Sequence, residues 1–384
     1  MKRCPVIEQQ KSNCNPQRTI LHLIDTTGPG GAETVFIQLA DNLKKHGFRS
    51  VVVIRGPGWV QEELIRRGLE PYVIPAKGSF AVGFLWQLIK LIRKYRVEVI
   101  QSHLLGSNVY SAIAGLITRT PVVATYHGMV DVEPNERFMW LKYAAMRHGI
   151  KRYIAVSQRL LENIRARKLL DIDKASVIYN GVELNARRTD LSALLRTRLK
   201  LPDDAVIVGS LGNVRPAKAY DVLIAAGAEL VKKYSNLHFV IAGHQKTSLM
   251  EKLDKQLETL GIAGHFHFLG FVDDSSAFLS QVDIFALSSS SEGFSIATIE
   301  AMAAQRPIIV TQCGGPEEII TPEVTGIMVA PNDPSALAQG LERLLVDPQL
   351  AQRLAVAGKD KVRKDFSLDK MIACYIEEYQ RLIS

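Results

Sequence analysis

Two glutamates, Glu292 and Glu300, stand on either side of the stretch GFSIATI in the second half of the chain. Glu292 is expected in a loop after an apolar run and Glu300 one to two turns into the following helix, so both carboxylates can face one crevice. Ser295 or a neighbour is expected to cap that helix, and Gly293 leaves amides free for an anion at its start. Two carboxylates so placed can accept hydrogen bonds from the vicinal hydroxyls of a sugar or a ribose. Capping and surface charge are the alternative interpretation.

A basic pair, Arg215 and Lys218, follows the apolar run at residues 205–211 and a glycine. Ligands of parallel sheets bind at the carboxyl ends of the strands, which is where this pair is expected. The planar guanidinium of Arg215 and the mobile ammonium of Lys218 could together clamp a diphosphate. Two solvated bases at the surface are the alternative.

The stretch GPGGAE at residues 28–33 lies between the first apolar run and the first helical pattern. Its glycines, among them Gly30 and Gly31, let the backbone approach a ligand, and the helix start favours phosphate or another anion. Glu33 stands where the dinucleotide pattern G-x-G-x-x-G needs its last glycine, and no Gly-Lys-Ser/Thr of a Walker loop follows. A tight strand-to-helix turn is the alternative.

The histidines and one acidic pair complete the candidates. His127 follows an apolar run and precedes Gly128, where a ligand would bind, although a structural histidine has the same pattern. Asp171 and Asp173 form a D-x-D pattern that can hold a metal, but they lie far along the sequence from the basic pair, and a capping or solvated loop is expected. No metal site is predicted. The other histidines lack metal-ligand spacing and are expected at the surface or in the core: His22, His46, His103, His148, His238, His244, His265 and His267.

Short apolar runs alternate with longer helical patterns along the chain, which predicts an α/β protein with parallel sheets. In the first half, strands are expected at residues 19–24, 50–54, 71–74, 97–101, 122–125 and 153–156. Helices are expected at residues 32–45, 60–67, 84–95, 107–118 and, after Ser157 as its cap, up to residue 167.

A second cycle of the same kind begins at residue 205. Its strands are expected at residues 205–211, 238–242, 265–269, 284–286, 308–311 and 326–329. Its helices are expected at residues 219–234, 249–260, 275–281, 295–304, 334–346, 351–365 and 368–382. The segment 185–202 has no strand pattern, so we predict a leader at 1–18, a first domain at 19–190 and a second at 191–365.

Composition limits the class of protein and of partner. The 384 residues fit two domains, or at most three, and 47% hydrophobic residues are enough for a sizeable core. The net charge of +8 favours an anionic partner such as a nucleotide or an acidic membrane surface. The aromatic pattern of an RNA-binding module is missing, so nucleic acid is not expected.

Features that direct a protein to a membrane or to secretion are also missing from the sequence. No apolar run approaches the ~18 residues of a spanning helix, and residues 1–18 lack the apolar core of a secretory signal. The four cysteines are far apart, so reduced thiols are expected. We therefore expect a cytoplasmic protein, with the cytoplasmic face of the membrane as an alternative place.

The stretch SSSSEGFSIATIEAMA at residues 288–303 resembles the E-x7-E motif of the family-4 retaining glycosyltransferases, which have the GT-B fold. Other pieces match this family in order: GPGGAE at 28–33, TYHG at 125–128, AVS at 155–157, IYNGV at 178–182, GNVR at 212–215 with Lys218, AG at 242–243, FLGF at 268–271 and GGPEE at 314–318. The resemblance covers residues 19–383. It implies two Rossmann-like domains facing each other across a cleft, with the last helix, residues 366–384, packing back on the first domain.

The resemblance also implies roles for residues at the transferred sugar. His127 would contact a hydroxyl of that sugar, and Glu292 would hold others, so these two are the expected catalytic residues. Backbone groups of Gly293, Phe294 and Ser295 would lie beside Glu292. The sugar would move from a nucleoside diphosphate with retention of configuration, as in a hexosyltransferase, and without a metal.

The resemblance assigns the rest of the donor as well. Arg215 and Lys218 would bind the diphosphate, and Glu300 would hold the ribose. The remaining contacts would come from the amides of Gly30 and Gly31, beside the diphosphate or the acceptor, and from the backbone of Gly270 and Phe271, beside the base. UDP is the commonest donor nucleotide in the family. Two positions depart from the family pattern, because Ala219 and Ser295 stand where glycine is common.

The acceptor is expected to be a glycan or a lipid-linked molecule, as in polysaccharide or lipopolysaccharide biosynthesis. The net positive charge and a group of apolar side chains favour it, although the same side chains could form the core of a helix: Phe80, Phe84, Leu85 and Trp86. A hydrolysing nucleotide-sugar epimerase of the same fold and a catalytically silent sugar-nucleotide binding protein are alternatives. The broken dinucleotide pattern argues against an oxidoreductase.

Overall fold

A computed structural model describes residues 18–76, 81–131, 138–166, 170–184 and 192–383. The expected leader at 1–18 lies outside these residues except for Arg18. The contacts divide the chain into two compact units, of which the first runs to Asn180 and takes in the chain again from Asp369, and the second spans Gly181–Leu368.

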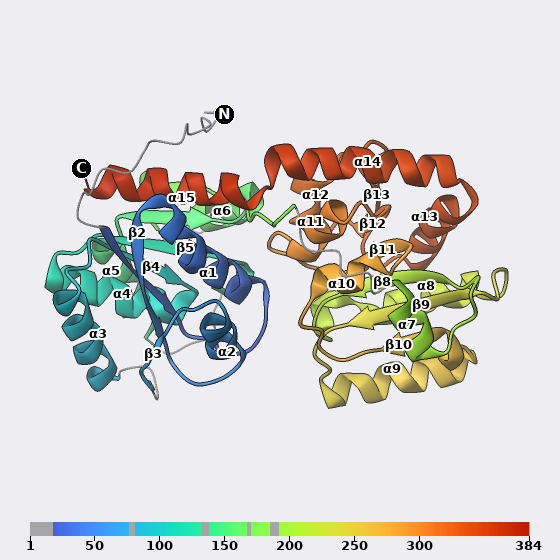
Figure 1. Ribbon diagram of the computed structural model, residues 1–384, viewed down its shortest axis with the longest axis horizontal. Coiled ribbons are helices and arrows are strands. Elements are labelled where there is room, and N and C mark those ends of the chain that lie inside the picture. The colour runs from blue at the N-terminus through green and yellow to red at the C-terminus, as the bar shows by residue number, and fades with distance from the viewer. Residues whose placement is uncertain (1–17, 77–80, 132–137, 167–169, 185–191, 384) are drawn as a thin grey trace. The chain divides into compact units, whose positions relative to one another are not determined.

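The first unit is built on a fully parallel sheet with the strand order β3-β2-β1-β4-β5-β6-β7 (Figure 1). Each strand pairs with the carboxyl ends aligned, so the loops that carry ligands leave from one edge. The strands are β1 (Arg18–Ile24), β2 (Phe48–Ile54), β3 (Tyr72–Val73), β4 (Val99–His103), β5 (Val122–Tyr126), β6 (Arg152–Ala155) and β7 (Ala175–Val177).

Helices cover this sheet, and the last helix of the chain is one of them. They are α1 (Gly31–Asn42), α2 (Trp59–Arg66), α3 (Val82–Lys94), α4 (Leu105–Thr118), α5 (Met139–Gly149), α6 (Gln158–Ala166) and α15 (Leu368–Ile383), which is red in Figure 1. Arg152 Nε bonds Glu378 Oε2 at 2.7 Å, and the buried Tyr379 bonds Gln101 at 3.0 Å. The apolar face of α15 therefore belongs to the core of the first unit.

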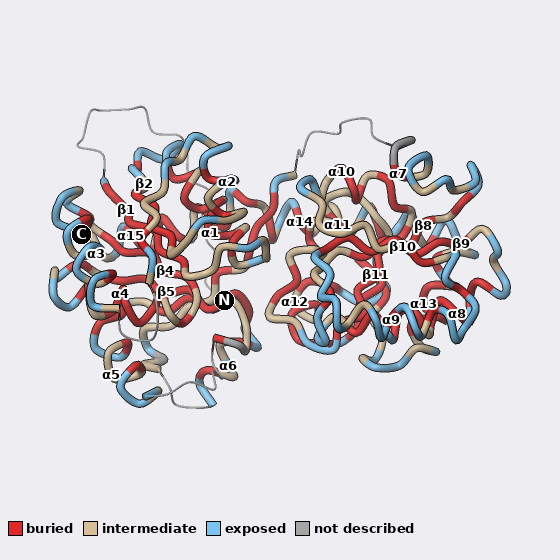
Figure 2. Tube along the Cα trace, turned by 90° about the horizontal axis from the view of Figure 1, so that it is seen from below, coloured by how far each residue is buried: buried red, intermediate tan, exposed pale blue. Residues whose placement is uncertain are grey.

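The second unit repeats the plan with a parallel sheet in the order β10-β9-β8-β11-β12-β13. Its strands are β8 (Val206–Leu211), β9 (Leu237–Ala242), β10 (Phe266–Phe268), β11 (Ile284–Leu287), β12 (Ile308–Thr311) and β13 (Ile327–Val329). Its helices are α7 (Ser192–Leu199), α8 (Tyr220–Leu230), α9 (Thr247–Leu260), α10 (Ser275–Ser280), α11 (Ile296–Ala303), α12 (Pro316–Ile319), α13 (Pro334–Val346) and α14 (Pro348–Asp365). In both units the central strands are mostly buried and the outer helix faces exposed, as Figure 2 shows.

The expected fold class is confirmed, because the chain forms two α/β units with parallel Rossmann-like sheets. The expected strand list of the first half was wrong in ending at residues 153–156, since β7 adds an edge strand. Its three residues are only half-buried, so they carry no alternating pattern that could have predicted them. Helix α5 was missed because its apolar residues Trp140 and Leu141 face solvent and not the core. None of the helices within the described ranges is both long and apolar enough to cross a bilayer.

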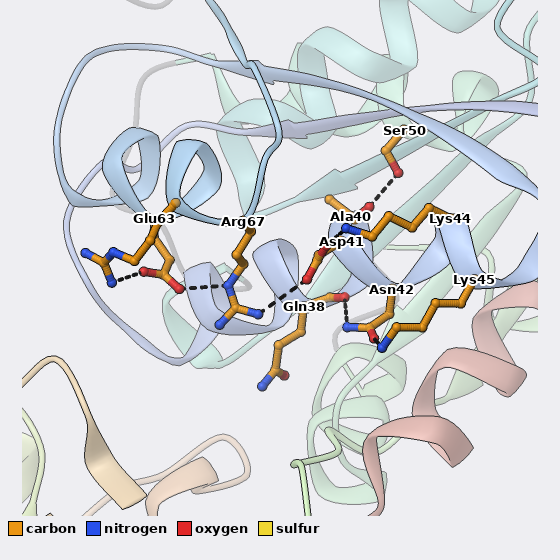
Figure 3. A network of polar contacts seen from close by, with 10 residues as sticks. Gln38, Ala40, Asp41, Asn42, Lys44, Lys45, Ser50, Glu63 and Arg67 are labelled. Atoms are coloured by element: carbon orange, nitrogen blue, oxygen red, sulfur yellow. Dashed lines mark hydrogen bonds and ion pairs between the residues drawn. The ribbon is translucent and has the colours of Figure 1, made fainter. Parts of the chain in front are cut away.

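Helices α1 and α2 are joined at the surface by the polar network in Figure 3. Arg67 bridges the two helices, because its Nε bonds Glu63 at 2.7 Å and its Nη1 lies 3.6 Å from Asp41. Ser50 of β2 donates to the carbonyl of Ala40 at 2.6 Å. The arginine of these ion pairs is about one-third exposed, so they contribute modestly and fix orientation, while the buried apolar residues beneath supply most of the stability.

Candidate active site

In both sheets the strand order reverses at the same topological position. In the first unit β1 lies between β2 and β4, and in the second β8 lies between β9 and β11. The loops that follow two such neighbouring strands diverge, which opens a crevice at the carboxyl ends. Lys218 follows β8 and Glu292 follows β11, so the sheet brings together two predicted residues that are 74 positions apart.

The contact between Lys218 and Glu292 is direct. Lys218 Nζ lies 2.7 Å from Glu292 Oε1, which also accepts a hydrogen bond from Ser289 Oγ at 2.7 Å. The amide of Ser290 donates to the carbonyl of Ala217 at 2.8 Å. These bonds tie the loop after β11 to the loop after β8, so the two charged groups are held by the backbone and not only by each other.

The two side chains are largely buried, with 18% of Lys218 and 15% of Glu292 exposed. Burial alone would lower the pKa of Lys218, but the attraction of Glu292 and of Tyr220 outweighs it, and the pKa is raised. Lys218 is therefore an ammonium at neutral pH. A charge pair held in this way offers a cation to an anionic ligand and a carboxylate to hydroxyl groups.

Glycines make this close arrangement possible. A Cβ at Gly212 would lie 2.5 Å from Cε of Lys218, so the lysine side chain passes directly over that glycine. A Cβ at Gly315 would lie 2.3 Å from Cα of Phe294, so the GGPEE segment packs against the loop that carries Glu292. The amide of Glu292 in turn donates to the carbonyl of Cys313 at 2.9 Å.

Arg215 differs from Lys218 in its surroundings. It precedes the short 3-10 helix Pro216–Lys218 and is exposed. Its carbonyl accepts the amide of Lys218 at 2.9 Å, but among the described residues its guanidinium has neither an ion pair nor a hydrogen bond. The two predicted diphosphate-binding residues therefore share a loop, and only Lys218 is engaged within the protein.

The residues after Glu292 combine an apolar anchor with strained backbone. The Phe294 side chain is 2% exposed and its ring centroid lies 5.5 Å from that of Phe366, so the side chain belongs to the core and is not available to a ligand. Ser295 adopts a left-handed conformation with φ 79°. It takes the N-cap position, where it or a neighbour was expected to cap the helix, but its Oγ bonds Thr298 Oγ1 at 2.7 Å and no backbone amide. The left-handed φ explains why glycine is common at this position.

Ala219 has the same explanation, with φ 47° and ψ 48° at the start of α8. A left-handed conformation strains alanine but not glycine. The relief of this strain should exceed the loss of one buried methyl group. We therefore expect Ala219→Gly to raise the free energy of unfolding, measured by urea denaturation, by about 0.5 kcal/mol. Ala217→Gly is the matched control in the preceding 3-10 helix and should lower it by about 0.5–1 kcal/mol. A loss of stability in Ala219→Gly would contradict the strain.

Glu300 lies on α11 and has its own polar partners. Its Oε1 accepts a hydrogen bond from Ser275 Oγ at 3.0 Å, and Ser275 begins α10 next to Asp274. Burial raises the pKa of Glu300 to about 7. Glu292 and Glu300 share no hydrogen-bond partner among the described residues, so each serves a separate part of the crevice.

The raised pKa of Glu300 predicts a pH dependence of stability. The folded protein keeps this proton up to about pH 7, whereas the unfolded chain releases it near 4.5, so stability falls as pH rises between these values. We expect Glu300→Gln to remove this loss and to raise the free energy of unfolding at pH 8 by about 2 kcal/mol. Urea denaturation at pH 5 and pH 8 measures it, and an equal effect at both pH values would contradict the assignment.

The loop after β10 brings Gly270 and Phe271 to the same edge of the sheet. Gly270 has φ 77°, and its carbonyl accepts the amide of Gly243 at 2.8 Å. The ring of Phe271 stacks on that of His244, with centroids 4.8 Å apart and planes inclined by 9°. His244 is exposed and was expected at the surface or in the core, so its stacking on Phe271 was not predicted from the sequence.

In the first unit, Gly30 and Gly31 begin α1, and the acidic side chain of Glu33 lies over Gly30. A Cβ at Gly30 would lie 2.4 Å from Oε2 of Glu33, which shows that this carboxylate folds back over the helix start. Asp25 follows β1 directly, and burial raises its pKa despite Arg55 at 3.8 Å. This negative charge opposes an anion at α1, so the second unit has the stronger groups for a diphosphate.

His127 lies just after β5 and is held from two sides. Its amide donates to Asp131 Oδ2 at 2.8 Å, and its Nε2 lies 2.9 Å from Nδ1 of His103. Burial lowers the pKa of His127 to about 3 and raises that of Asp131 to about 6. The sequence missed His103 and Asp131 as its partners, although both stand at the ends of strands or in the loops that follow them.

Asp171 and Asp173 of the D-x-D pattern precede β7, so they do not lie at the carboxyl ends of the strands. Asp171 forms an ion pair at 2.9 Å with Lys174, which lowers the pKa of Asp171. Across the described ranges no three His, Cys, Asp or Glu side chains are grouped so as to hold a metal ion. Cys313 is buried, and burial raises the pKa of its thiol to about 12.

Two family models match the chain in succession. The one described as Glycosyltransferase Family 4 matches residues 29–186, and the one described as Glycosyl transferases group 1 matches residues 193–361. A D-inositol 3-phosphate glycosyltransferase from Salinispora arenicola is 28% identical over 86% of this chain and 78% of the relative. The chain spans 64% of the length of the protein of the same name from Salinispora tropica. The lipopolysaccharide core biosynthesis glycosyltransferase LpsD from Rhizobium meliloti is 24% identical over 92% of this chain and 95% of its own.

Solved structures show the same fold. HepE from Anabaena, in complex with UDP and glucose, superposes with a TM-score of 0.85 at 22% identity, over 95% of this chain and all of that one. A sucrose-phosphate synthase from Thermosynechococcus elongatus gives 0.76 at 19% identity, over 95% and 99% of the two chains. With one family model on each Rossmann-like unit, the chain belongs to the family-4 type glycosyltransferases of the GT-B fold.

Proposed function

We propose that the protein transfers a hexose from a nucleoside diphosphate sugar, with retention of configuration, to a glycan or lipid-linked acceptor. The observation that carries this proposal is the Lys218–Glu292 pair at the β8/β11 switch point. It offers a cation for a diphosphate beside a carboxylate for sugar hydroxyls. The solved complex of HepE with UDP and glucose has the same fold, and UDP is the donor nucleotide that we propose.

The other predicted residues extend this donor site. Arg215 is exposed next to Lys218 and can turn its guanidinium onto the diphosphate. Glu300, which is bonded to Ser275 at the start of α10, would accept hydrogen bonds from the ribose. The stacked rings of His244 and Phe271 would face the base.

The reaction that we propose is a displacement on one face of the sugar. The bond between the anomeric carbon and the diphosphate breaks, and the acceptor oxygen forms its bond to that carbon on the same face. The leaving phosphate oxygen takes the proton of the acceptor. Arg215 and Lys218 stabilise the charge that develops on the leaving group, without a metal. Glu292 binds the sugar and is not a nucleophile, in keeping with its engagement by Lys218 and Ser289.

The acceptor side is proposed for the first unit. Helix α3 buries Phe84 and exposes Trp86 to 64%, with Lys90 Nζ 5.7 Å from its ring centre. Trp140 of α5 is 72% exposed. Aromatic side chains beside basic ones suit the headgroup region of an acidic membrane, where lipid-linked acceptors reside. Vesicles with anionic lipid should bind the protein. Equal binding by Trp86→Ala and Trp140→Ala would contradict a membrane contact through these two tryptophans. Phe80 lies outside the described residues.

Thermal unfolding with nucleotides tests the donor site. We expect UDP, in the presence of a chelator, to stabilise the protein by about 2.7 kcal/mol at 100 times its dissociation constant. GDP and ADP should give smaller shifts, and the double variant Arg215→Ala with Lys218→Ala should abolish the shift. A protein that no nucleotide stabilises would overturn the proposal.

Product analysis separates the proposal from its alternatives. With the nucleotide sugar and no acceptor, a hydrolysing epimerase would release free sugar altered at one carbon. A silent binding protein would shift on nucleotide addition and yet form no product with any acceptor. We expect slow release of unaltered sugar without acceptor and transfer with it.

A further inference from the structure

A buried chain of hydrogen bonds runs from the C-terminal helix to His127 within the first unit. Tyr379 Oη of α15 donates to Gln101 Oε1 at 3.0 Å. Gln101 Nε2 lies 3.2 Å from Nε2 of His103, and His103 Nδ1 lies 2.9 Å from Nε2 of His127. Tyr379, Gln101 and His103 are fully buried, so this path is shielded from bulk solvent.

The surroundings of Gln101 determine which way its amide points. Its nitrogen lies 3.3 Å from the carbonyl oxygen of Ser102 and 2.9 Å from Thr125 Oγ1. A backbone carbonyl can only accept a hydrogen bond, so the group that faces it must be the NH2 and not the oxygen. The amide oxygen is left for Tyr379, which donates to it.

The orientation of that amide fixes the proton on each imidazole. The NH2 has two hydrogens for three neighbours and cannot accept a hydrogen bond, so a proton on Nε2 of His103 would have no acceptor there, and Nε2 is the unprotonated nitrogen. A neutral His103 then carries its proton on Nδ1 and donates it to Nε2 of His127. A neutral His127 therefore carries its own proton on Nδ1. The two ring planes are inclined by only 21° and the nitrogens are too close for face-to-face stacking, which suits an N–H···N bond between ring edges.

Both rings are neutral under ordinary conditions. Burial lowers the pKa of His127 to about 3, and burial with the nearby His127 and His22 holds the pKa of His103 well below its usual range. Within the part of the chain that the structure describes, Nδ1 of His127 has no hydrogen-bond partner. Among the described residues of this chain of hydrogen bonds, that N–H is therefore the donor left for a ligand.

We propose that Gln101 and His103, held by Tyr379, are positioning residues that fix His127 as the Nδ1–H tautomer, and that this N–H donates to a hydroxyl oxygen of the transferred sugar. The tautomer follows from the hydrogen bonds alone, whereas the contact with the sugar rests on the proposed function. The proposal makes the C-terminal helix part of the site, because Tyr379 supports the amide that orients both imidazoles. A site whose supporting groups are fixed in advance spends no binding energy on ordering them.

Nitrogen NMR of the full chain, labelled with 15N-histidine and without ligand, tests the tautomer directly. His127→Asn identifies the two signals of His127. We expect a protonated, pyrrole-type Nδ1 and an unprotonated, pyridine-type Nε2 that do not change between pH 6 and 8. A proton on Nε2, or a charged ring at pH 7, would overturn the proposal.

Two variants test the role of the chain. Gln101→Met keeps the length of the side chain and removes the amide, so His127 should exchange between both tautomers and kcat/KM should fall about tenfold. Tyr153→Phe is the matched control, because Tyr153 is also buried in the first unit but its hydroxyl donates to the carbonyl of Met146 at 2.9 Å, outside this chain of hydrogen bonds. It should leave the signals of His127 and the activity unchanged. Unchanged His127 signals in Gln101→Met would overturn the positioning role.

A variant that fails to fold still leaves a decisive measurement, since the wild-type spectrum alone decides the tautomer. The two parts of the proposal also fail separately. If the wild-type spectrum is as expected but His127→Asn transfers sugar at the normal rate, the contact with the sugar is wrong while the tautomer stands. If the spectrum is wrong while His127→Asn is inactive, the proposed function survives and the positioning chain does not.

Discussion

Replacing Glu292 by glutamine should lower kcat by about 10²–10³-fold while the protein stays folded. Glutamine keeps the size of the side chain and an oxygen for Ser289, so the loop after β11 loses no buried volume. It removes the negative charge that strengthens hydrogen bonds from sugar hydroxyls and that holds Lys218 in place. Steady-state kinetics with saturating nucleotide sugar measure the loss of kcat, and a melting curve shows whether the protein stays folded.

Glu323→Gln is the control for Glu292→Gln. Glu323 lies in the same unit and is also paired to a base, Arg343, at 2.7 Å, but 54% of its side chain is exposed. It should change neither the rate nor the melting temperature by much, because exposed ion pairs contribute little. Near-normal turnover of Glu292→Gln, with Glu323→Gln behaving as expected, would sink the assignment of Glu292 to the donor sugar.

The fold could be predicted from the sequence because each strand and helix is defined by a short stretch of consecutive residues. Runs such as residues 205–211 and 308–311 are apolar enough to be read as buried parallel strands, and their alternation with helices predicts the two sheets. The candidate site is only partly local. The glycine-rich and acidic motifs mark the loops, and the left-handed φ of Ala219 and Ser295 explains two departures from the family pattern.

Contacts between distant loops could not be predicted from the sequence. Lys218 meets Glu292 only because β8 and β11 are neighbours, and His103 meets His127 only because β4 pairs with β5. Ser295 stands at the N-cap position of α11, as one option of the prediction had it, but its side-chain oxygen bonds Thr298 and caps no backbone amide. Such pairings depend on strand order and rotamers, which no motif encodes.

Replacing Lys218 by methionine should produce the largest loss of stability, about 2–3 kcal/mol of unfolding free energy, because it leaves the largely buried Glu292 without its cation. The partial exposure of both side chains keeps this below the loss for a fully buried pair. Arg215→Met should leave stability unchanged, since among the described residues its guanidinium has no partner to lose. Urea denaturation of both variants measures the contrast.

The same two variants separate a structural role of Lys218 from a binding role. Each residue is expected to donate a charge-assisted hydrogen bond to the diphosphate, worth roughly 1.5–3 kcal/mol, so each variant should weaken UDP binding by about tenfold or more. Adding Glu292→Gln to Lys218→Met should recover part of the stability, because the uncompensated charge is gone, but none of the affinity. If Lys218→Met loses stability and binds UDP normally, Lys218 serves only to hold Glu292, and Arg215 alone among the two meets the phosphates.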